Sequence, residues 1–146
     1  MKDLVKDGRV IKEKSGKRDW SFLIHAGVLC HNNYDRSDNI LMDMWAEDDW
    51  NGIIFHISSE MLNDASLFQV GDLIVQAMEA GERKGYGRDS WLLVPPAEYK
   101  AACARHLDAH FRGELVDPSD GKPHLAGALF ACYAMLVHKK IGESRE

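Results

Sequence analysis

The sequence has few cysteines, and their arrangement excludes two common ways of stabilising a small domain. The three cysteines, Cys30, Cys103 and Cys132, are widely spaced, odd in number and not arranged as a CxxC pair. A disulfide framework uses an even number of cysteines and a zinc knuckle uses closely spaced pairs, so the pattern indicates neither. It is typical of a reducing compartment, and we expect a cytoplasmic location.

The sequence also lacks a hydrophobic run long enough to cross a membrane. The longest apolar run, from Leu125 to Val137, has about thirteen residues, whereas a membrane-spanning helix needs about twenty. Charged residues such as Lys2, Asp3 and Lys6 surround only a very short apolar stretch at the N-terminus, which is not typical of a signal peptide. We therefore expect neither export nor a membrane anchor, and interpret the long run as a buried helix.

An excess of positive charge is missing as well. The chain has 18 Lys or Arg against 23 Asp or Glu, and its formal net charge of −5 disfavours nonspecific binding to nucleic acid. Neither a repeat nor a Pro/Gly/Ser-rich linker divides the chain. With 45% hydrophobic and 28% charged residues, the composition is that of a globular protein. We predict one domain over residues 1–146.

Hydrophobic periodicity predicts a mainly α-helical fold, because apolar residues recur at helical spacing along most of the chain. Residues 1–20 are rich in charge, and Arg9–Ile11 is long enough only for a short strand. We predict a compact bundle of about four to five helices, with a short strand or an irregular segment at the N-terminus. The helices are expected from Ser37 to about Asp64 with a break at Asn51-Gly52, from Leu67 to about Lys84, from Pro96 to about Arg112, and from Pro123 onward.

Two polar groups in the second half of the chain are candidates for chemistry. His106 and His110 lie at i and i+4 on the helix face that also carries Tyr99 and Cys103. They could be core histidines bonded to backbone carbonyls, or metal ligands that need a third partner. The loop 113–124 carries three carboxylates and a histidine, and a solvated connection between helices would explain that composition equally well.

Several spaced motifs in this region together resemble a known family. The motifs are the Gly, Lys, Tyr-Gly and Trp residues between Gly81 and Trp91, then Arg105-His106-Leu107, then Gly113-Glu114, Asp117, Gly121 and His124-Leu125-Ala126. In this order they resemble the N-terminal domain of phage and prophage dATP/dGTP diphosphohydrolases, an all-α fold related to MazG-type pyrophosphohydrolases. The resemblance covers about residues 77–138, which favours a family-like helical core over residues 67–140. The N-terminal half, residues 1–66, is not covered.

The resemblance implies a metal-dependent reaction on a nucleotide. The expected substrate is a purine deoxynucleoside triphosphate, dATP or dGTP, hydrolysed to monophosphate and pyrophosphate with Mg²⁺ or Mn²⁺ as cofactor. MazG-type enzymes hold the metal with two carboxylate pairs. The matching pairs here are Glu79-x-x-Glu82 and Glu114-x-x-Asp117, although the second pair follows Gly113 and could lie in a loop, and solvated charges would explain either pair.

Other side chains of the same motifs are candidates for binding the nucleotide and for catalysis. Cations can bind phosphates and aromatic rings can stack on a base, although a buried aromatic residue is equally expected from core packing. Histidines can act as acid and base near neutral pH. The candidate substrate-binding residues are Lys84, Tyr86, Arg88, Trp91 and Arg105, and the candidate catalytic residues are His106, Glu114 and His124.

The sequence departs from the family pattern at two positions of the last helix. Gly127 stands where the family commonly has a second histidine, and Ala131 stands where it has an asparagine. These departures leave a second function open, that of a non-catalytic phage-encoded protein that binds a nucleotide or inhibits a host protein. The two-faced apolar last helix could also form a homo-oligomer interface, or bury both faces within one chain.

Overall fold

The computed structural model describes residues 4–6, 9–11, 17–30 and 36–144. Its described part is mainly α-helical, which confirms the predicted fold class. Two three-residue strands form an antiparallel pair near the N-terminus with Val5 opposite Val10, so Arg9–Ile11 is indeed a short strand. The elements are β1 (Leu4–Lys6), β2 (Arg9–Ile11), two 3-10 segments (Trp20–Phe22, Ala26–Cys30), α1 (Ser37–Ala46), α2 (Trp50–His56) with a π-helical extension (Ile57–Met61), α3 (Leu67–Arg83), a 3-10 turn (Ser90–Leu92), α4 (Pro96–Phe111) and α5 (His124–Ser144).

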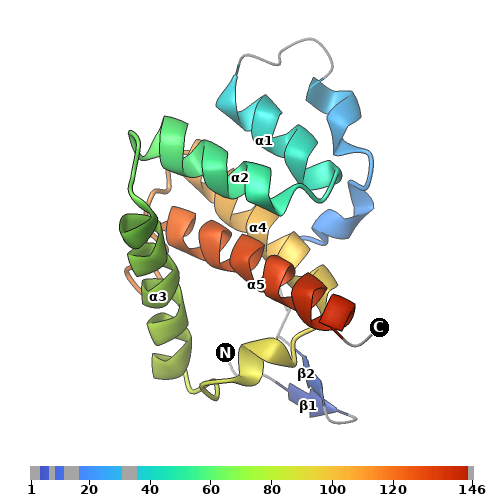
Figure 1. The fold of residues 1–146 in the computed structure, drawn as a ribbon, viewed down its shortest axis with the longest axis vertical. Helices are drawn as coiled ribbons and strands as arrows, with labels where there is room; N and C mark the ends of the chain where they lie inside the picture. The colour runs from blue at the N-terminus through green and yellow to red at the C-terminus, as the bar shows by residue number, and fades with distance from the viewer. Residues whose placement is uncertain (1–3, 7–8, 12–16, 31–35, 145–146) are drawn as a thin grey trace.

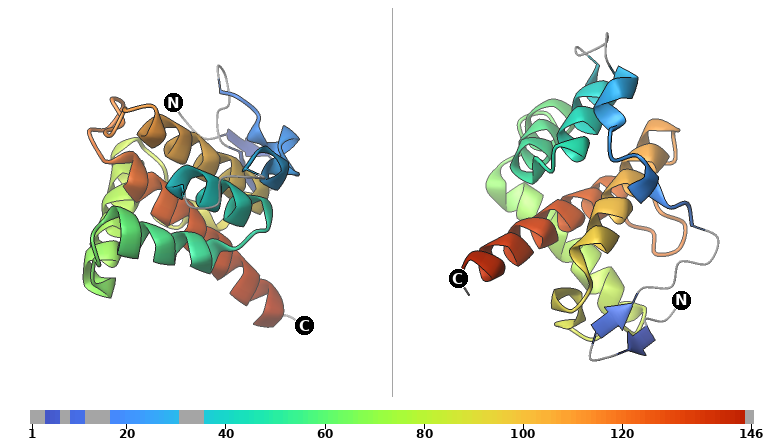
Figure 2. Two further views of the ribbon diagram at one scale, coloured as in Figure 1. Left: turned by 90° about the horizontal axis from the view of Figure 1, so that it is seen from above. Right: turned by 90° about the vertical axis from the view of Figure 1, so that its right-hand side faces the viewer.

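Helix α5 lies at the centre of the bundle (Figures 1 and 2). It packs against α4 most extensively and also against α3 and α2. Its first half is almost entirely buried, including Leu125, Leu129 and Cys132, as expected for the long apolar run. In the described part of the chain, no helix combines the length and the apolar character that crossing a membrane requires.

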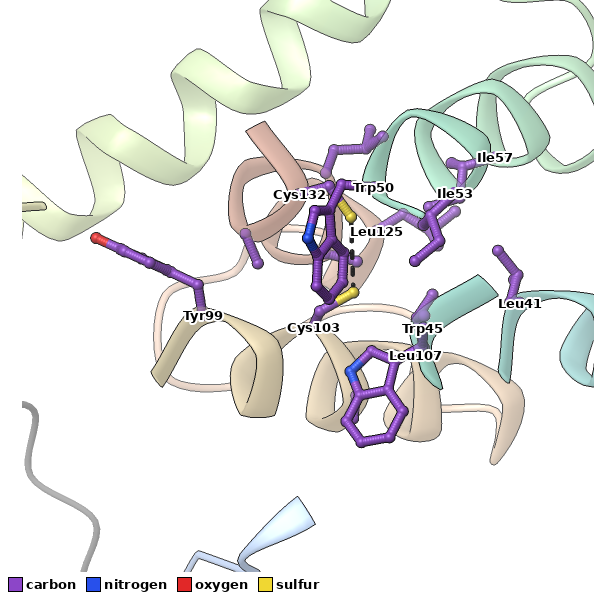
Figure 3. Close-up of a cluster of buried hydrophobic side chains, with 14 of the residues drawn as sticks. Leu41, Trp45, Trp50, Ile53, Ile57, Tyr99, Cys103, Leu107, Leu125 and Cys132 are labelled. Atoms are coloured by element: carbon purple, nitrogen blue, oxygen red, sulfur yellow. Dashed lines mark hydrogen bonds between the residues drawn. The ribbon is translucent and has the colours of Figure 1, made fainter. Parts of the chain in front are cut away.

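The hydrophobic core lies between α1 and α2 on one side and α4 and α5 on the other (Figure 3). Ile53 of α2 and Ile57 are completely buried in it. Cys103 and Cys132 face each other across α4 and α5 as free thiols, with their sulfur atoms 3.7 Å apart. This contact and burial raise the pKa of the Cys132 thiol well above its ordinary value, so both cysteines act as small apolar core residues.

Local sequence signals explain where the helices begin and end. Ser66 and Gln69 form a capping box at the start of α3, because each side chain accepts a hydrogen bond from the other's backbone N–H. Pro96 opens α4, and Gly113, with a φ of 97°, follows its end. The predicted ranges of α3 and α4 are therefore confirmed.

The predicted division of this segment into two helices is confirmed, but the position of the break at Asn51-Gly52 was wrong, because the chain turns earlier, between α1 and α2. Asp48 adopts a positive φ of 58°, and the Asp49 carboxylate accepts a hydrogen bond from the backbone N–H of Gly52, at 2.9 Å. Asp49 is thus the N-cap of α2. Asn51 and Gly52 lie in its first turn, where glycine leaves room for the capping carboxylate.

Replacement of Leu129 by alanine tests the central position of α5. Its side chain is 0% exposed, so replacement by alanine loses apolar contacts and leaves a cavity. We expect Leu129→Ala to lower the free energy of unfolding by about 2–5 kcal/mol, measured by urea denaturation. The control Leu67→Ala, at a side chain 84% exposed, should change it by less than about 0.5 kcal/mol. Equal losses in the two variants would contradict the central position of α5.

Candidate functional site

A cavity of about 510 Å³ lies between the end of α3, the turn at Ser90–Leu92, α4, the loop 112–123 and the start of α5. This volume is within the usual range for small-molecule sites. Charged, histidine and aromatic side chains dominate its walls. They are Lys17, Glu82, Lys84, Tyr86, Arg88, Trp91, Glu98, Tyr99, Arg105, His106, Asp117, Asp120, Lys122, His124 and Phe130.

Two histidines from different helices meet at one end of the cavity. His106 comes from α4 and His124 is the first residue of α5, and their Nδ1 atoms are 2.9 Å apart. A hydrogen bond at this distance requires one Nδ1 to carry the proton and the other to accept it. The sequence had considered His106 together with His110, whereas the structure pairs His106 with His124.

Gly127 provides the space for the His106 ring. A Cβ atom at this position of α5 would lie 2.4 Å from Nε2 of His106, and within 2.6 Å of two further ring atoms. These distances are far below van der Waals contact, so any side chain at position 127 would displace the imidazole. The departure from the family pattern at Gly127 is thus coupled to the position of His106.

The environment of His106 keeps its imidazole neutral. Burial, together with the nearby His124 and Arg105, lowers its pKa to about 4, against the opposing charges of Asp117 and Asp120. A neutral imidazole retains a lone pair on one ring nitrogen. At neutral pH His106 is therefore able to accept a proton or bind a metal ion.

The loop after α4 is an ordered turn that brings Asp117 to the histidine pair. The backbone N–H of Asp117 donates to the carbonyl of Lys122, at 2.8 Å, and the Asp117 carboxylate accepts a hydrogen bond from the backbone N–H of Ser119, at 2.8 Å. Burial alone would raise the pKa of Asp117, but the Ser119 hydrogen bonds and the charges of Lys84 and His124 outweigh it and lower the pKa. Asp117 is therefore ionised beside the histidines.

Glu114, from the same loop, lies outside the cavity lining but next to His124. Its Oε2 atom is 3.4 Å from Nε2 of His124, and Nε2 has no hydrogen-bond partner among the described residues. Because Glu114 is exposed, its carboxylate is screened by water. It approaches the histidine pair from the outer side.

The cations of the cavity differ in how they are partnered. Lys84 forms an ion pair with Asp120, with Nζ and Oδ2 3.1 Å apart. Arg105 is half-buried, and no hydrogen bond or ion pair to it occurs among the described residues. Burial lowers its pKa, although the nearby charge of Glu98 opposes this effect. Arg105 therefore offers a partly desolvated guanidinium to an anion.

The aromatic residues of the cavity form one cluster. The ring of Trp91 lies 6.0 Å from that of Phe130, and the ring of Tyr99 lies 5.7 Å from Phe130 on another side. The Tyr99 hydroxyl donates a hydrogen bond to the Trp91 carbonyl. Trp91 thus packs in this cluster and also lines the cavity.

The predicted site residues come together only in part. The candidate substrate-binding residues all line the cavity, and so do His106, His124, Glu82 and Asp117. Glu79 is exposed and does not line it. The two carboxylate pairs do not lie on facing helices: Glu79 and Glu82 are on α3, whereas Glu114 and Asp117 are in the loop, because Gly113 ends α4 with a positive φ.

Sequence reasoning missed Asp120 and Lys122 as candidate site residues. Both line the cavity, and Asp120 also accepts a hydrogen bond from the Lys122 backbone N–H, at 2.9 Å. The turn-forming sequence Asp120-Gly121 was visible, but it indicated only a loop. Which side of that loop faces the helices depends on how the loop folds back between α4 and α5.

Comparison with known proteins supports the resemblance of the helical core. The family model described as dATP/dGTP diphosphohydrolase, N-terminal, matches residues 64–145. Among the residues that line the cavity, Lys17 alone falls outside this match. Neither the curated proteins nor the solved structures provide a match. Because the matched region is more than half of the chain and contains nearly the whole cavity, the chain belongs to the family of dATP/dGTP diphosphohydrolase N-terminal domains.

Proposed function

We propose that the protein hydrolyses a purine deoxynucleoside triphosphate, dATP or dGTP, to the monophosphate and pyrophosphate. The observation that carries this proposal is a cavity in which the half-buried guanidinium of Arg105 lies beside the pair of His106 and His124. A triphosphate needs partly desolvated cations, and its hydrolysis needs groups that activate water. Family membership supports the same substrate class.

The cationic side chains would bind the phosphates. Arg105 can form two parallel hydrogen bonds to phosphate oxygens, whereas Lys84 acts as a point charge held by Asp120. Arg88 is exposed at the cavity and can contact the outer phosphates. Tyr86 and Trp91 line the same cavity and offer ring faces to the purine.

Mg²⁺ or Mn²⁺ is the metal that this reaction implies, and the donor set of the cavity fits it. Glu82 and Asp120 line the cavity, and Mg²⁺ is usually held by one or two carboxylates together with waters and the phosphates of its substrate. These residues would hold the ion against the triphosphate. A bound ion neutralises the charge of the phosphates and lowers the pKa of the attacking water.

His106, His124 and Glu114 would activate the attacking water. In the reaction, the water oxygen bonds to the α-phosphorus while the bond from that phosphorus to the bridging oxygen breaks. Pyrophosphate leaves with the electron pair. His124 is aligned for this task by Nδ1 of His106 and by the carboxylate of Glu114 near its Nε2 atom. The proton of the water would pass to Nε2 of His124, because Nδ1 is held by His106, and the Glu114 carboxylate 3.4 Å from Nε2 would stabilise the imidazolium that results.

The proposal is tested by incubating the purified 146-residue chain with dATP or dGTP and Mg²⁺ or Mn²⁺. We expect release of pyrophosphate and formation of the deoxynucleoside monophosphate, followed by a coupled pyrophosphate assay and chromatography. Release of inorganic phosphate and a diphosphate would contradict the position of cleavage. Nucleotide binding without any turnover at high protein concentration would favour the non-catalytic alternative.

Arg105 provides a quantitative test of phosphate binding. Arg105→Lys keeps the charge but loses the two parallel hydrogen bonds, so we expect KM for the nucleotide to rise about tenfold, which corresponds to about 1.4 kcal/mol. The matched control is Arg112→Lys. Arg112 follows the same helix and is already paired with Asp108 outside the cavity. Steady-state kinetics should leave the control unchanged, and an equal rise in both variants would remove Arg105 from the site.

A further inference from the structure

His106, Asp117 and His124 form a cluster with the composition of a metal site, which we call the His-Asp cluster. One ring nitrogen of each histidine and one carboxylate oxygen of Asp117 all lie within 4.8 Å of one another. It is the single group of this kind in the described part of the chain. We propose that the His-Asp cluster binds a divalent transition metal ion of the Zn²⁺ or Co²⁺ class, without requiring the nucleotide.

The distance between the two histidines suits a shared ion. Their Nδ1 atoms are 2.9 Å apart and share one proton. Two imidazole nitrogens that bind the same ion at about 2.1 Å each lie about 3.0–3.4 Å from each other, depending on the bond angle. A metal ion could therefore replace the shared proton with only a small outward movement of the rings.

In both histidines the ligand atom would be Nδ1, because the surroundings of Nε2 prevent it from facing the same ion. Nε2 of His106 lies against the backbone of α5 at Gly127. Nε2 of His124 is buried without a hydrogen bond, and Glu114 approaches it to 3.4 Å. Metal-bound imidazoles usually turn their second N–H toward a carboxylate or a carbonyl, which fixes the tautomer. Glu114 would take this positioning role once Nδ1 of His124 binds an ion.

The donor set also selects the class of ion. Two imidazoles favour Zn²⁺, Co²⁺ and related transition metals, whereas Mg²⁺ prefers oxygen ligands alone. Glu82 and Asp120 remain as oxygen donors for the Mg²⁺ that accompanies a triphosphate. Three protein ligands leave an open position for water or a phosphate oxygen. The cluster thus goes beyond the proposed function, because its metal binding can be measured without any hydrolysis.

The test is metal binding by the 146-residue chain, freed of tags and treated with a chelator. Zn²⁺ binding is followed by calorimetry, and Co²⁺ binding by visible absorption. We expect one strongly bound ion per chain and an affinity reduced more than about tenfold in His106→Gln and Asp117→Asn. The matched control is His110→Gln, one turn further along α4 and outside the cluster. Far-UV circular dichroism checks that every variant is folded.

Each outcome separates the metal site from the proposed function. Unchanged Zn²⁺ affinity in folded His106→Gln, an equal loss in His110→Gln, or equally tight binding of Mg²⁺ would overturn the His-Asp cluster as a transition-metal site. Zn²⁺ bound by the cluster without hydrolysis of dATP or dGTP would support the cluster and contradict the proposed reaction. Mg²⁺-dependent hydrolysis by a chain that binds no Zn²⁺ or Co²⁺ would support the proposed reaction and contradict the His-Asp cluster as a metal site.

Discussion

His124→Gln is expected to lower the rate of dATP or dGTP hydrolysis by about 100- to 10,000-fold, the range for loss of a group that activates water. His124 is buried at the start of α5, where it joins His106 on one side to Glu114 on the other. Glutamine keeps a polar group of similar size but cannot accept the proton or the charge. We expect the loss in kcat, measured by pyrophosphate release at saturating nucleotide.

The control for this variant is His138→Gln on the same helix. His138 is not part of the cavity lining, and its ring lies against Tyr99, with centroids 5.9 Å apart. Its replacement should leave kcat within about twofold of the wild type, since it changes no group near the reaction. A similar loss in both variants would point to damage of α5 itself. Full activity of folded His124→Gln would remove His124 from the mechanism.

Gly127→Ala is expected to reduce hydrolysis about 100-fold, the cost of misplacing a catalytic group by about 1 Å. The new Cβ would lie 2.4 Å from Nε2 of His106. Because the imidazole is the end of a rotatable side chain, the ring will turn away, and the contact with His124 will be lost. The strain that remains should lower the free energy of unfolding by no more than about 1–3 kcal/mol. Activity and urea denaturation are measured on the same preparation.

Gly142→Ala is the matched control, because it places the same methyl group on the same helix. A Cβ at Gly142 meets no atom within 4 Å, so alanine should raise stability by about 0.5–1 kcal/mol and leave activity unchanged. Raised stability and unchanged activity in Gly127→Ala would contradict the position of the His106 ring against α5. Comparing the two variants thus separates the effect of alanine on helix propensity from the effect of filling the space that the His106 ring occupies.

The two departures from the family pattern take different meanings in the structure. Gly127 is coupled to His106, because a histidine at position 127 could not coexist with the His106 ring in its present place. Ala131 lies in the buried core of the bundle, 2% exposed, in an apolar environment where an asparagine would need hydrogen-bond partners. The space of a side chain at position 127 is therefore taken by the His106 ring, and Ala131 is part of the apolar core.

The sequence by itself determined those helices whose ends and apolar faces are set by signals within a few residues of the chain. The apolar spacing along α3 and α5, Pro96 at the start of α4 and Gly113 after its end were sufficient. Each of these signals acts within a few residues along the chain. The family motifs also identified nine of the residues that line the cavity, among them Lys84, Arg105, His106 and His124.

The tertiary structure alone decided which of these side chains meet. His106 and His124 are 18 positions apart in the sequence, and they are joined only because the turn at Asp117 folds α5 back against α4. The same turn keeps Glu114 on the outer side, although sequence spacing had paired it with Asp117. Periodicity fixes the face of a helix on which a residue lies, but the distance between two helices depends on their packing. Here the His106 ring of α4 can lie against α5 because position 127 is a glycine.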